Sequence, residues 1–368
     1  MSNFILPRRR ARTQHGFSLI EVLIGLLIAM IGVVIMMEVL ITSEQRTRST
    51  TGANDAMSGG AIMLHMVQGD LLQAGYGINA LKLLGCSLTL PNGKTVPLAP
   101  VVIYKASDTS TVVPQGDANT DRLLVVYGSS TGQPEGNTIY SVAGDAYTVQ
   151  SPTSFNTNDY VLTYTGSCAT PIVLTQIAAA TTTPGVTVNV TAGTGIAAAT
   201  TLYNLGQTPH VIAYAIRNGA LTSCDYMASD CTNTSAANWT AVGGNIVSLR
   251  AQYGRDTNGG TMNGQIDTWD QTTPTTSCLW ARAPAVRFAL VAKSTQYETA
   301  INASGQRTCD TTTTPSAPTW QATTATGTSQ ALPIDLSAAS DWQCYRYRTF
   351  ENVAPSRNVV WMGVQAGC

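Results

Sequence analysis

The residues best placed to do chemistry lie near the start of the chain, where Gly16-Phe17-Ser18-Leu19-Ile20-Glu21 opens an apolar run that reaches Ile41. Glu21 sits inside this run, and no further charge occurs from Val22 to Met37. An acidic side chain at the centre of a membrane helix costs about 2.5–3.5 kcal/mol, so such a residue is functional by default. The position of Glu21 therefore indicates a specific role for its carboxylate.

The apolar run is long enough to act as a membrane span. Phe17 to Ile41 can cross a hydrocarbon core of about 30 Å, and four arginines, Arg8, Arg9, Arg10 and Arg12, precede it. The positive-inside rule keeps these arginines in the cytoplasm and predicts that everything after Ile41 lies outside it. No small-residue cleavage site follows the run, which disfavours an ordinary secretory signal. One remaining possibility is cleavage before the run, after Gly16. The other is an uncleaved single-pass membrane anchor whose Glu21 side chain reaches the membrane surface.

The stretch G-F-S-L-I-E-V-L-I from Gly16 to Ile24 resembles the processing motif of type IV prepilins. The resemblance implies a leader of residues 1–16, cleavage by prepilin peptidase between Gly16 and Phe17, and N-methylation at Phe17. Cleavage creates an amine at Phe17, about four helical rises of roughly 1.5 Å from Glu21. In stacked subunits, Glu21 of one chain could neutralise the Phe17 amine of the next, since an unpaired buried ion costs several kcal/mol.

The helix that carries this motif should continue beyond the membrane. Met57, Ala61, Leu64, Val67 and Leu71 recur at helical spacing. The pattern predicts one long helix over residues 17–75, with 17–41 in the membrane and the second half packed on the head. Glycines in the middle, namely Gly52, Gly59 and Gly60, should weaken it by about 1 kcal/mol each against alanine. The segment Asp70 to Gly77 closes the helix.

Residues 76–368 alternate short β-like runs with turn residues, which predicts a large β-rich head and an α+β, type IV pilin-like fold. Two tracts rich in threonine and alanine, Ala178 to Thr201 and Asp310 to Ala331, are interpreted as loops. The strands are expected at Val101–Tyr104, Arg122–Tyr127, Tyr160–Tyr164, His210–Arg217, Ile246–Tyr253, Ala285–Ala292 and Cys344–Phe350.

Composition agrees with an exported protein. The formal net charge is −1 and only 11% of residues are charged, so no basic surface indicates nucleic acid as a partner. An even number of cysteines in an exported head indicates disulfides, although eight cysteines permit 105 complete pairings. Cys224 and Cys231 could close a local loop, and Cys368 should pin the C-terminal region to an unnamed partner. The eight are Cys86, Cys168, Cys224, Cys231, Cys278, Cys309, Cys344 and Cys368.

One loop could bind a metal. Within the segment 256–267, Asp256, Asn258 and Asp267, with Asn263 as a further candidate, could supply oxygen ligands for calcium. Gly260 stands where a calcium loop would carry Asp or Asn, so a hairpin turn without metal is favoured. We expect no cofactor.

Enzymatic motifs are missing from the sequence. No G-x-S-x-G, H-E-x-x-H or P-loop occurs, and His65 and His210 lie in no recognised nucleophile motif. We therefore expect that the protein is not an enzyme. Trp239, Trp269, Trp280 and Trp320 could form a glycan-binding face, but core packing is favoured.

The C-terminal third adds a second resemblance. Asn245–Gly254, Val286–Val291 and Tyr347–Asn358 look like segments of the PilW-like minor pilins, whereas residues 81–208 resemble no family. The resemblance implies a minor pilin that contributes to assembly and initiation of a type IV pilus, with the filament tip as one position for it. Its partners would be prepilin peptidase, other minor and major pilins and the inner-membrane assembly machinery, and its head would be periplasmic before incorporation. A pseudopilin of a type II secretion system and a tip adhesin are the alternatives.

Overall fold

The fold is described from a computed structural model, which describes residues 16, 18–130, 132–180, 187–324 and 327–368. The chain divides into two compact units, residues 1–51 and residues 52–368. The boundary falls within the first helix, so the last turns of that helix belong with the head.

The first element is α1, a continuous helix over Leu19–Gln73. Its first part, Leu19–Glu44, is long and apolar enough to cross a membrane. The helix runs without interruption through the three glycines that were expected to weaken it. It ends two residues before Gly75, whose φ of +84° is a left-handed conformation that glycine adopts without strain.

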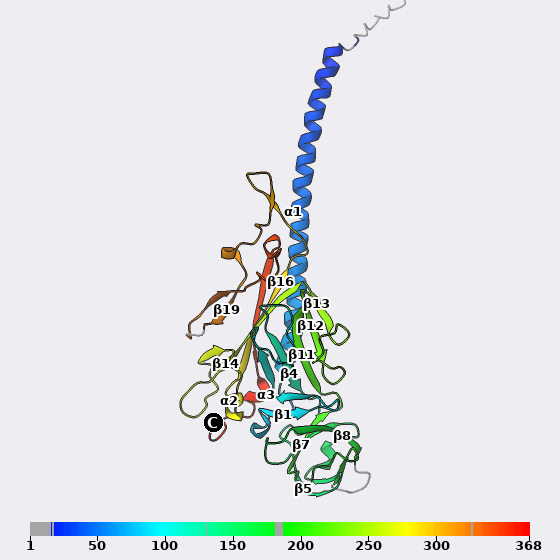
Figure 1. The fold of residues 1–368 in the computed structure, drawn as a ribbon, viewed down its shortest axis with the longest axis vertical. Helices are drawn as coiled ribbons and strands as arrows, with labels where there is room; N and C mark the ends of the chain where they lie inside the picture. Colours follow the sequence, from blue (N-terminus) through cyan, green and yellow to red (C-terminus); the bar gives the residue numbers. More distant parts are fainter. Residues whose placement is uncertain (1–15, 17, 131, 181–186, 325–326) are drawn as a thin grey trace, which may run out of the picture. The chain divides into compact units, whose positions relative to one another are not determined.

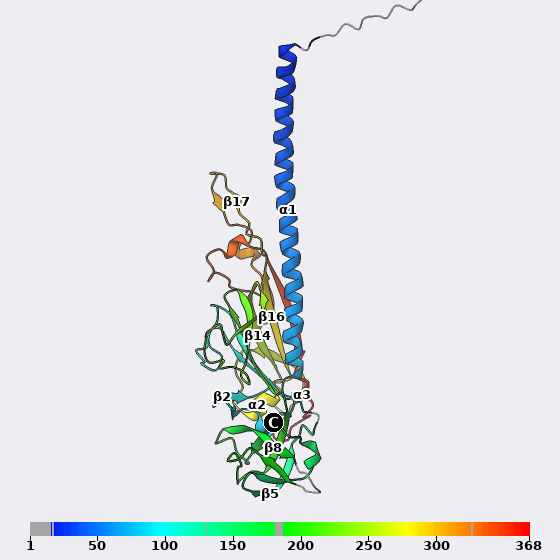
Figure 2. The same ribbon diagram turned by 90° about the vertical axis from the view of Figure 1, so that its right-hand side faces the viewer.

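Two antiparallel sheets form the body of the head (Figure 1). In the five-stranded sheet the order is β13-β12-β11-β4-β3, and in the four-stranded sheet it is β15-β14-β16-β21. Figure 2 shows β14 and β16 alongside the C-terminal part of α1. The strands are β3 (Val101–Tyr104), β4 (Arg122–Tyr127), β11 (His210–Arg217), β12 (Ala220–Asp225), β13 (Thr240–Gly244), β14 (Ile246–Arg255), β15 (Thr268–Asp270), β16 (Ala285–Lys293) and β21 (Tyr347–Pro355).

A second strand system is inserted into the first sheet. Because β4 and β11 are hydrogen-bonded neighbours, residues 128–209 form an insertion between them. Strand β8 pairs with both β7 and β9, so β8-β7-β10-β5-β6-β9 close on themselves as a small barrel. The members are β5 (Asn137–Ala143), β6 (Ala146–Val149), β7 (Tyr160–Tyr164), β8 (Ile172–Ala180), β9 (Thr187–Val190) and β10 (Thr201–Gly206), and β1 (Cys86–Thr89) and β2 (Thr95–Leu98) extend the sheet beyond β8.

This inserted barrel has its own apolar core, which includes Tyr147, Val161, Ile177 and Leu202. It lies beyond the C-terminal end of α1, where the N–H of Gly128 donates to the carbonyl of Tyr76 at 2.8 Å (Figure 1). Other barrel residues, among them Tyr203 and Leu205, join the main core of the head. The barrel therefore packs against the rest of the head through shared core residues and is not joined to it by the connecting chain alone. It accounts for much of residues 81–208, the segment that the sequence analysis did not assign to a family.

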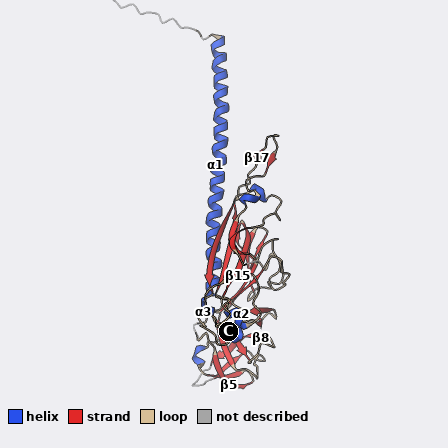
Figure 3. Cartoon of the chain, turned by 90° about the vertical axis from the view of Figure 1, so that its left-hand side faces the viewer, coloured by secondary structure: helices blue, strands red, loops and turns tan. Residues whose placement is uncertain are grey.

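Short elements complete the head, in which strands predominate (Figure 3). The remaining strands form two separate hairpins, β17–β18 and β19–β20. Their bounds, with those of the short helices, are α2 (Ser277–Ala281), α3 (Arg357–Val360), β17 (Ala300–Ile301), β18 (Arg307–Thr308), β19 (Thr319–Thr323) and β20 (Ser329–Pro333).

All eight cysteines are paired, which confirms the expectation of a disulfide-bonded head. The local Cys224–Cys231 loop is present, and the partner of Cys368 is Cys278. Cys86–Cys168 links β1 to the chain just before β8, and Cys309–Cys344 closes the segment that carries β19 and β20.

Two expectations about local structure are wrong. Val67 and Leu71 of the predicted head-facing stripe are buried, but Met57 and Ala61 are exposed, and the buried face runs instead through Ala56 and Gly60 in this part of the helix. The two threonine- and alanine-rich tracts are not simply loops. The first contains β9, and the second contains β19 and most of β20, because alternate residues such as Val188 and Trp320 are buried.

Candidate assembly site

The processing motif lies at the N-terminal end of α1. Gly16 is exposed and precedes the helix, whereas Phe17, the expected site of cleavage and N-methylation, lies outside the described residues. Glu21 stands in the first turn, where its N–H donates to the carbonyl of Ser18 at 3.0 Å. A carboxylate in the first turn is favoured by the helix dipole. The Glu21 side chain is exposed, so it is available to a partner outside this chain.

The other end of α1 is clamped to the head by one carboxylate. The Tyr127 hydroxyl on β4 donates to Asp70 Oδ1 at 2.9 Å, and the Tyr214 hydroxyl on β11 donates to Asp70 Oδ2. Burial, followed by the nearby Asp70 charge, raises the pKa of both tyrosines, so both remain donors at neutral pH. Asp70 therefore joins the helix to the two strands that flank the inserted barrel.

A close approach of helix and sheet occurs at Gly60. A Cβ built at Gly60 would overlap the ring of Phe350 on β21, whereas one at Gly59 would meet nothing within 4 Å. The glycine thus permits the aromatic ring to lie directly against the helix backbone. The apolar-stripe pattern missed this contact because glycine contributes no apolar side chain to it.

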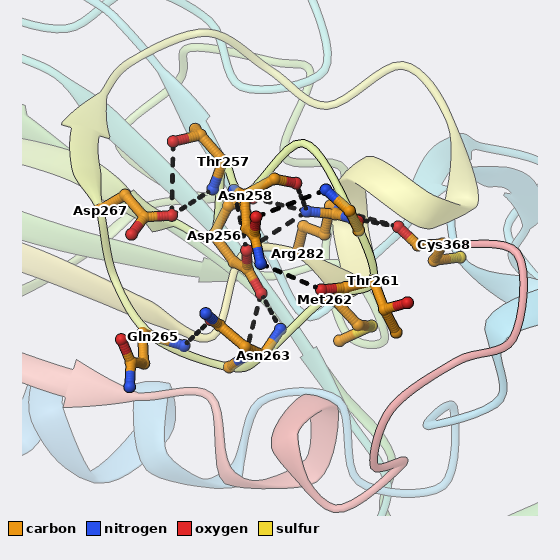
Figure 4. Close-up of polar contacts among 12 residues, drawn as sticks. Asp256, Thr257, Asn258, Thr261, Met262, Asn263, Gln265, Asp267, Arg282 and Cys368 are labelled. Atoms are coloured by element: carbon orange, nitrogen blue, oxygen red, sulfur yellow. Dashed lines mark hydrogen bonds and ion pairs between the residues drawn. The ribbon is translucent and has the colours of Figure 1, made fainter.

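The proposed calcium loop connects β14 to β15 and is organised by its own hydrogen bonds (Figure 4). Asp256 Oδ2 accepts from the N–H groups of Asn263 at 2.6 Å and Gly264 at 2.9 Å. Asp267 Oδ2 accepts from the N–H of Thr257 at 2.7 Å, and Asn258 Oδ1 accepts from Gly260 at 3.4 Å. The candidate ligand oxygens therefore accept hydrogen bonds from within the loop and hold it closed between the antiparallel strands β14 and β15.

The positive charge that lies against this loop is the guanidinium of Arg282. Its guanidinium lies 3.2 Å from Asp256 Oδ1, and it donates to the Asn258 carbonyl at 2.8 Å (Figure 4). Its Nε also donates to the main-chain oxygen of Cys368 at 2.7 Å. Arg282 follows α2, which carries Cys278, so it joins the loop to the Cys278–Cys368 disulfide. The sequence analysis did not identify Arg282, since its partners lie 22 or more residues away.

Electrostatics within the loop favour the charged form of Asp256. Burial alone would raise its pKa, but N–H donors from Gly264, Asn263 and Asn258, with the Arg282 charge, outweigh burial and leave the pKa below its usual range. Within the part of the chain that the structure describes, no group of three or more histidine, cysteine, aspartate or glutamate side chains could hold a metal ion.

The two histidines and four tryptophans considered as candidates lie either on the surface or packed against other side chains. His65 is exposed on α1, and His210 stacks on Tyr127 with ring centroids 4.7 Å apart. Of the four tryptophans considered for a binding face, Trp239, Trp280 and Trp320 are buried. The fourth, Trp269, lies under the Arg287 guanidinium at 4.7 Å. The favoured interpretation of these tryptophans as packing residues is confirmed. The exposed tryptophan of the head is Trp361 instead.

Comparison with known proteins adds two matches. The family model described as Type IV Pilus-assembly protein W matches residues 213–362, and the prokaryotic N-terminal methylation motif matches residues 11–37. The first match runs from β11 to α3 and includes most strands of the two sheets. The inserted barrel lies outside both matches. No curated protein and no solved structure matches the chain significantly.

These matches agree with the architecture described above. The methylation motif begins just before an apolar helix that can span a membrane, and that helix continues into a β-rich head with four disulfides. The two matches together support a PilW-like type IV pilin, that is, a minor pilin-like subunit with an N-terminal helix apolar enough to anchor it in a membrane.

Proposed function

We propose that this chain is a minor pilin that helps to initiate assembly of a type IV pilus and is placed at or near the filament tip. The observation that carries this proposal is the size of the head, to which the inserted barrel of residues 128–209 adds a second core. A helical filament repeats its subunits at close axial intervals, so a head enlarged in this way fits best where it is not surrounded by copies of itself.

The route to that position begins with processing. Prepilin peptidase cleaves between Gly16 and Phe17 and the new N-terminus is methylated, while the chain is held in the inner membrane with its head in the periplasm. Other minor and major pilins and the inner-membrane assembly machinery are its partners. Exposed Glu21 then neutralises the amine of a neighbouring Phe17 in the filament core, where an unpaired charge would cost several kcal/mol. The role is structural and not enzymatic.

Gold labelling of the head on isolated pili tests the position. Sparse label at filament ends, with fewer pili when the chain is deleted, is the expected result. Dense label along the filament would contradict it. Glu21→Ala should abolish incorporation while the membrane-bound chain persists, and Glu135→Ala, which changes an exposed glutamate of the inserted barrel, should not.

Two other functions remain candidates, each with a specific observation. The processing motif also suits a pseudopilin of a type II secretion system, and loss of secretion without loss of pili would favour it. The inserted barrel, which lies outside the matched models, suits an adhesin. Loss of adhesion with normal piliation would favour that role.

A further inference from the structure

A groove opens where the end of α1 meets the C-terminal segment of the head. It has a volume of about 910 Å³ and is lined by Leu72 and Tyr76 from the end of α1, Ser129 after β4, and Arg357, Val360 and Trp361 at α3. We call it the α1–α3 groove. All of its lining residues belong to the head unit, residues 52–368.

The α1–α3 groove has firmly held walls. The Asn358 side chain, which is buried, donates to the carbonyls of Gln73 and Ala74 at 3.0 Å each and so fixes α3 against the end of α1. Gln73 is the last residue of α1 and Ala74 follows it, so neither carbonyl has the partner four residues on that continues a helix, and the Gln73 carbonyl accepts only one main-chain bond, from the N–H of Tyr76 at 3.1 Å. The N–H of Gly75 donates to the Val126 carbonyl at 2.8 Å, which fixes the opposite side. The groove is therefore preformed, and a partner would lose little entropy in ordering it.

Apolar side chains are left open to solvent at this groove. Trp361 is 75% exposed and Val360 is 52% exposed, although the other large aromatic side chains of the surrounding strands are mostly buried. Val364, three residues further on, is 62% exposed. Tryptophan, tyrosine and arginine are the residue types that most often dominate binding energy at protein interfaces, and all three line this groove.

The positive charge of Arg357 indicates what kind of partner the α1–α3 groove can bind. Arg357 is the charged residue that lines the groove, and it makes no ion pair with any residue that the structure describes. A partner that enters the groove should therefore bring a carboxylate with its apolar side chain. A second copy that met this chain groove to groove would bring two Arg357 side chains together, which disfavours self-association.

The position of the groove indicates what that partner is. One wall is the last turn of α1, and the exposed face of the same helix continues away from it through Ile62, which is 59% exposed, and Met57. A type IV pilin associates with other pilins, and α1 is the element that carries its assembly motif. A neighbouring pilin that packs along this face of α1 would meet the groove at the end of the helix.

We propose that the α1–α3 groove is a docking site for the head of a neighbouring pilin of different sequence, which inserts a bulky apolar side chain flanked by a carboxylate. This proposal rests on the function proposed above and names a partner surface for it. Trp361 and Val360 supply the apolar contact, and Arg357 pairs with the carboxylate at the rim.

Site-specific photocrosslinking in the native host tests the proposal. A photoreactive amino acid replaces Trp361 in the full-length chain, and a second variant carries it at Tyr140, an aromatic residue of the inserted barrel that is 67% exposed. The expected product at position 361 is an adduct with the head of another chain that carries the N-terminal methylation motif, identified by peptide mapping. A lipid adduct, an adduct with a protein outside the pilin class, an adduct with a second copy, or no adduct would overturn the proposal.

Substitutions then test the chemistry. Trp361→Ala and Arg357→Glu should each lower co-purification with the crosslinked pilin by about tenfold or more, whereas Tyr140→Ala should leave it unchanged. Equal yields from all three variants would contradict the assignment. The same samples report on N-methylated Phe17. If Phe17 is processed normally but the adduct is absent, the docking site is wrong and the pilin function stands, whereas an unprocessed chain contradicts the proposed function itself.

Discussion

The contrast between Gly59 and Gly60 gives a sharp test of how α1 packs on the head. Alanine at either position should gain about 1 kcal/mol of helix propensity. At Gly59 nothing lies within 4 Å of the added methyl group, so that gain is realised. At Gly60 the methyl group would overlap the Phe350 ring, and overpacking of this kind typically costs 1–3 kcal/mol.

We therefore expect Gly59→Ala to be more stable than the parent by about 1 kcal/mol, and Gly60→Ala to be less stable than Gly59→Ala by about 1–3 kcal/mol. Urea unfolding of the detergent-solubilised chain, followed by near-ultraviolet circular dichroism, measures both. The double variant Gly60→Ala with Phe350→Ala should recover part of the difference, because the ring that the methyl group meets is gone. If Gly60→Ala and Gly59→Ala are equally stable, the close approach of α1 to β21 is wrong.

Three further substitutions test the clamp, the loop and a buried arginine. Asp70→Ala should lower the free energy of unfolding by about 2–5 kcal/mol because two tyrosine hydroxyls lose their acceptor, and a smaller loss in a Tyr214→Phe background would be the sign of direct coupling. Asp256 has a lowered pKa, so its contribution to stability should be present above its unfolded pKa of about 3.9 and lost as pH falls through the folded value. At pH 7 the Asp256→Asn variant should have a lower free energy of unfolding than the parent. Between pH 3 and 7 its free energy of unfolding should fall less steeply with acid than that of the parent. Identical pH profiles would contradict the assigned role of the Asp256 charge in the loop. Arg287 contacts the rings of Trp269 and Trp320 and donates to the Gln252 side chain, and burial lowers its pKa to about 10. Arg287→Lys keeps the charge but loses the planar stack, so a loss of about 2 kcal/mol in unfolding monitored by tryptophan fluorescence is expected, and full stability would contradict that role.

Local sequence pattern was enough to place many strands. Val101–Tyr104, Arg122–Tyr127, Tyr160–Tyr164 and His210–Arg217 begin and end where the sequence predicts, since each is a short apolar run between turn residues. The end of α1 was likewise visible because glycine at position 75 marks the helix end.

Features that depend on contacts distant in sequence were not visible. The barrel closes because β8 pairs with β9 as well as β7, and the local sequence of a strand does not predict which strands will pair with it. The close approach of α1 to β21 depends on Gly60, which contributes no apolar side chain to a sequence pattern, whereas Met57 fits the apolar pattern and is exposed. Arg282 was missed for the same reason: its importance comes from joining Asp256 to Cys368.

The processing motif was the clearest signal in the sequence, and it also carries the central claim. Mass spectrometry of the N-terminus of the membrane-extracted chain, beside a Gly16→Ala variant, tests it most directly. A parent chain that begins at N-methylated Phe17 and an uncut variant are the predicted results. An intact leader in the parent, or a cut beyond Ile41, would contradict the assignment as a processed pilin and leave Glu21 without its proposed role.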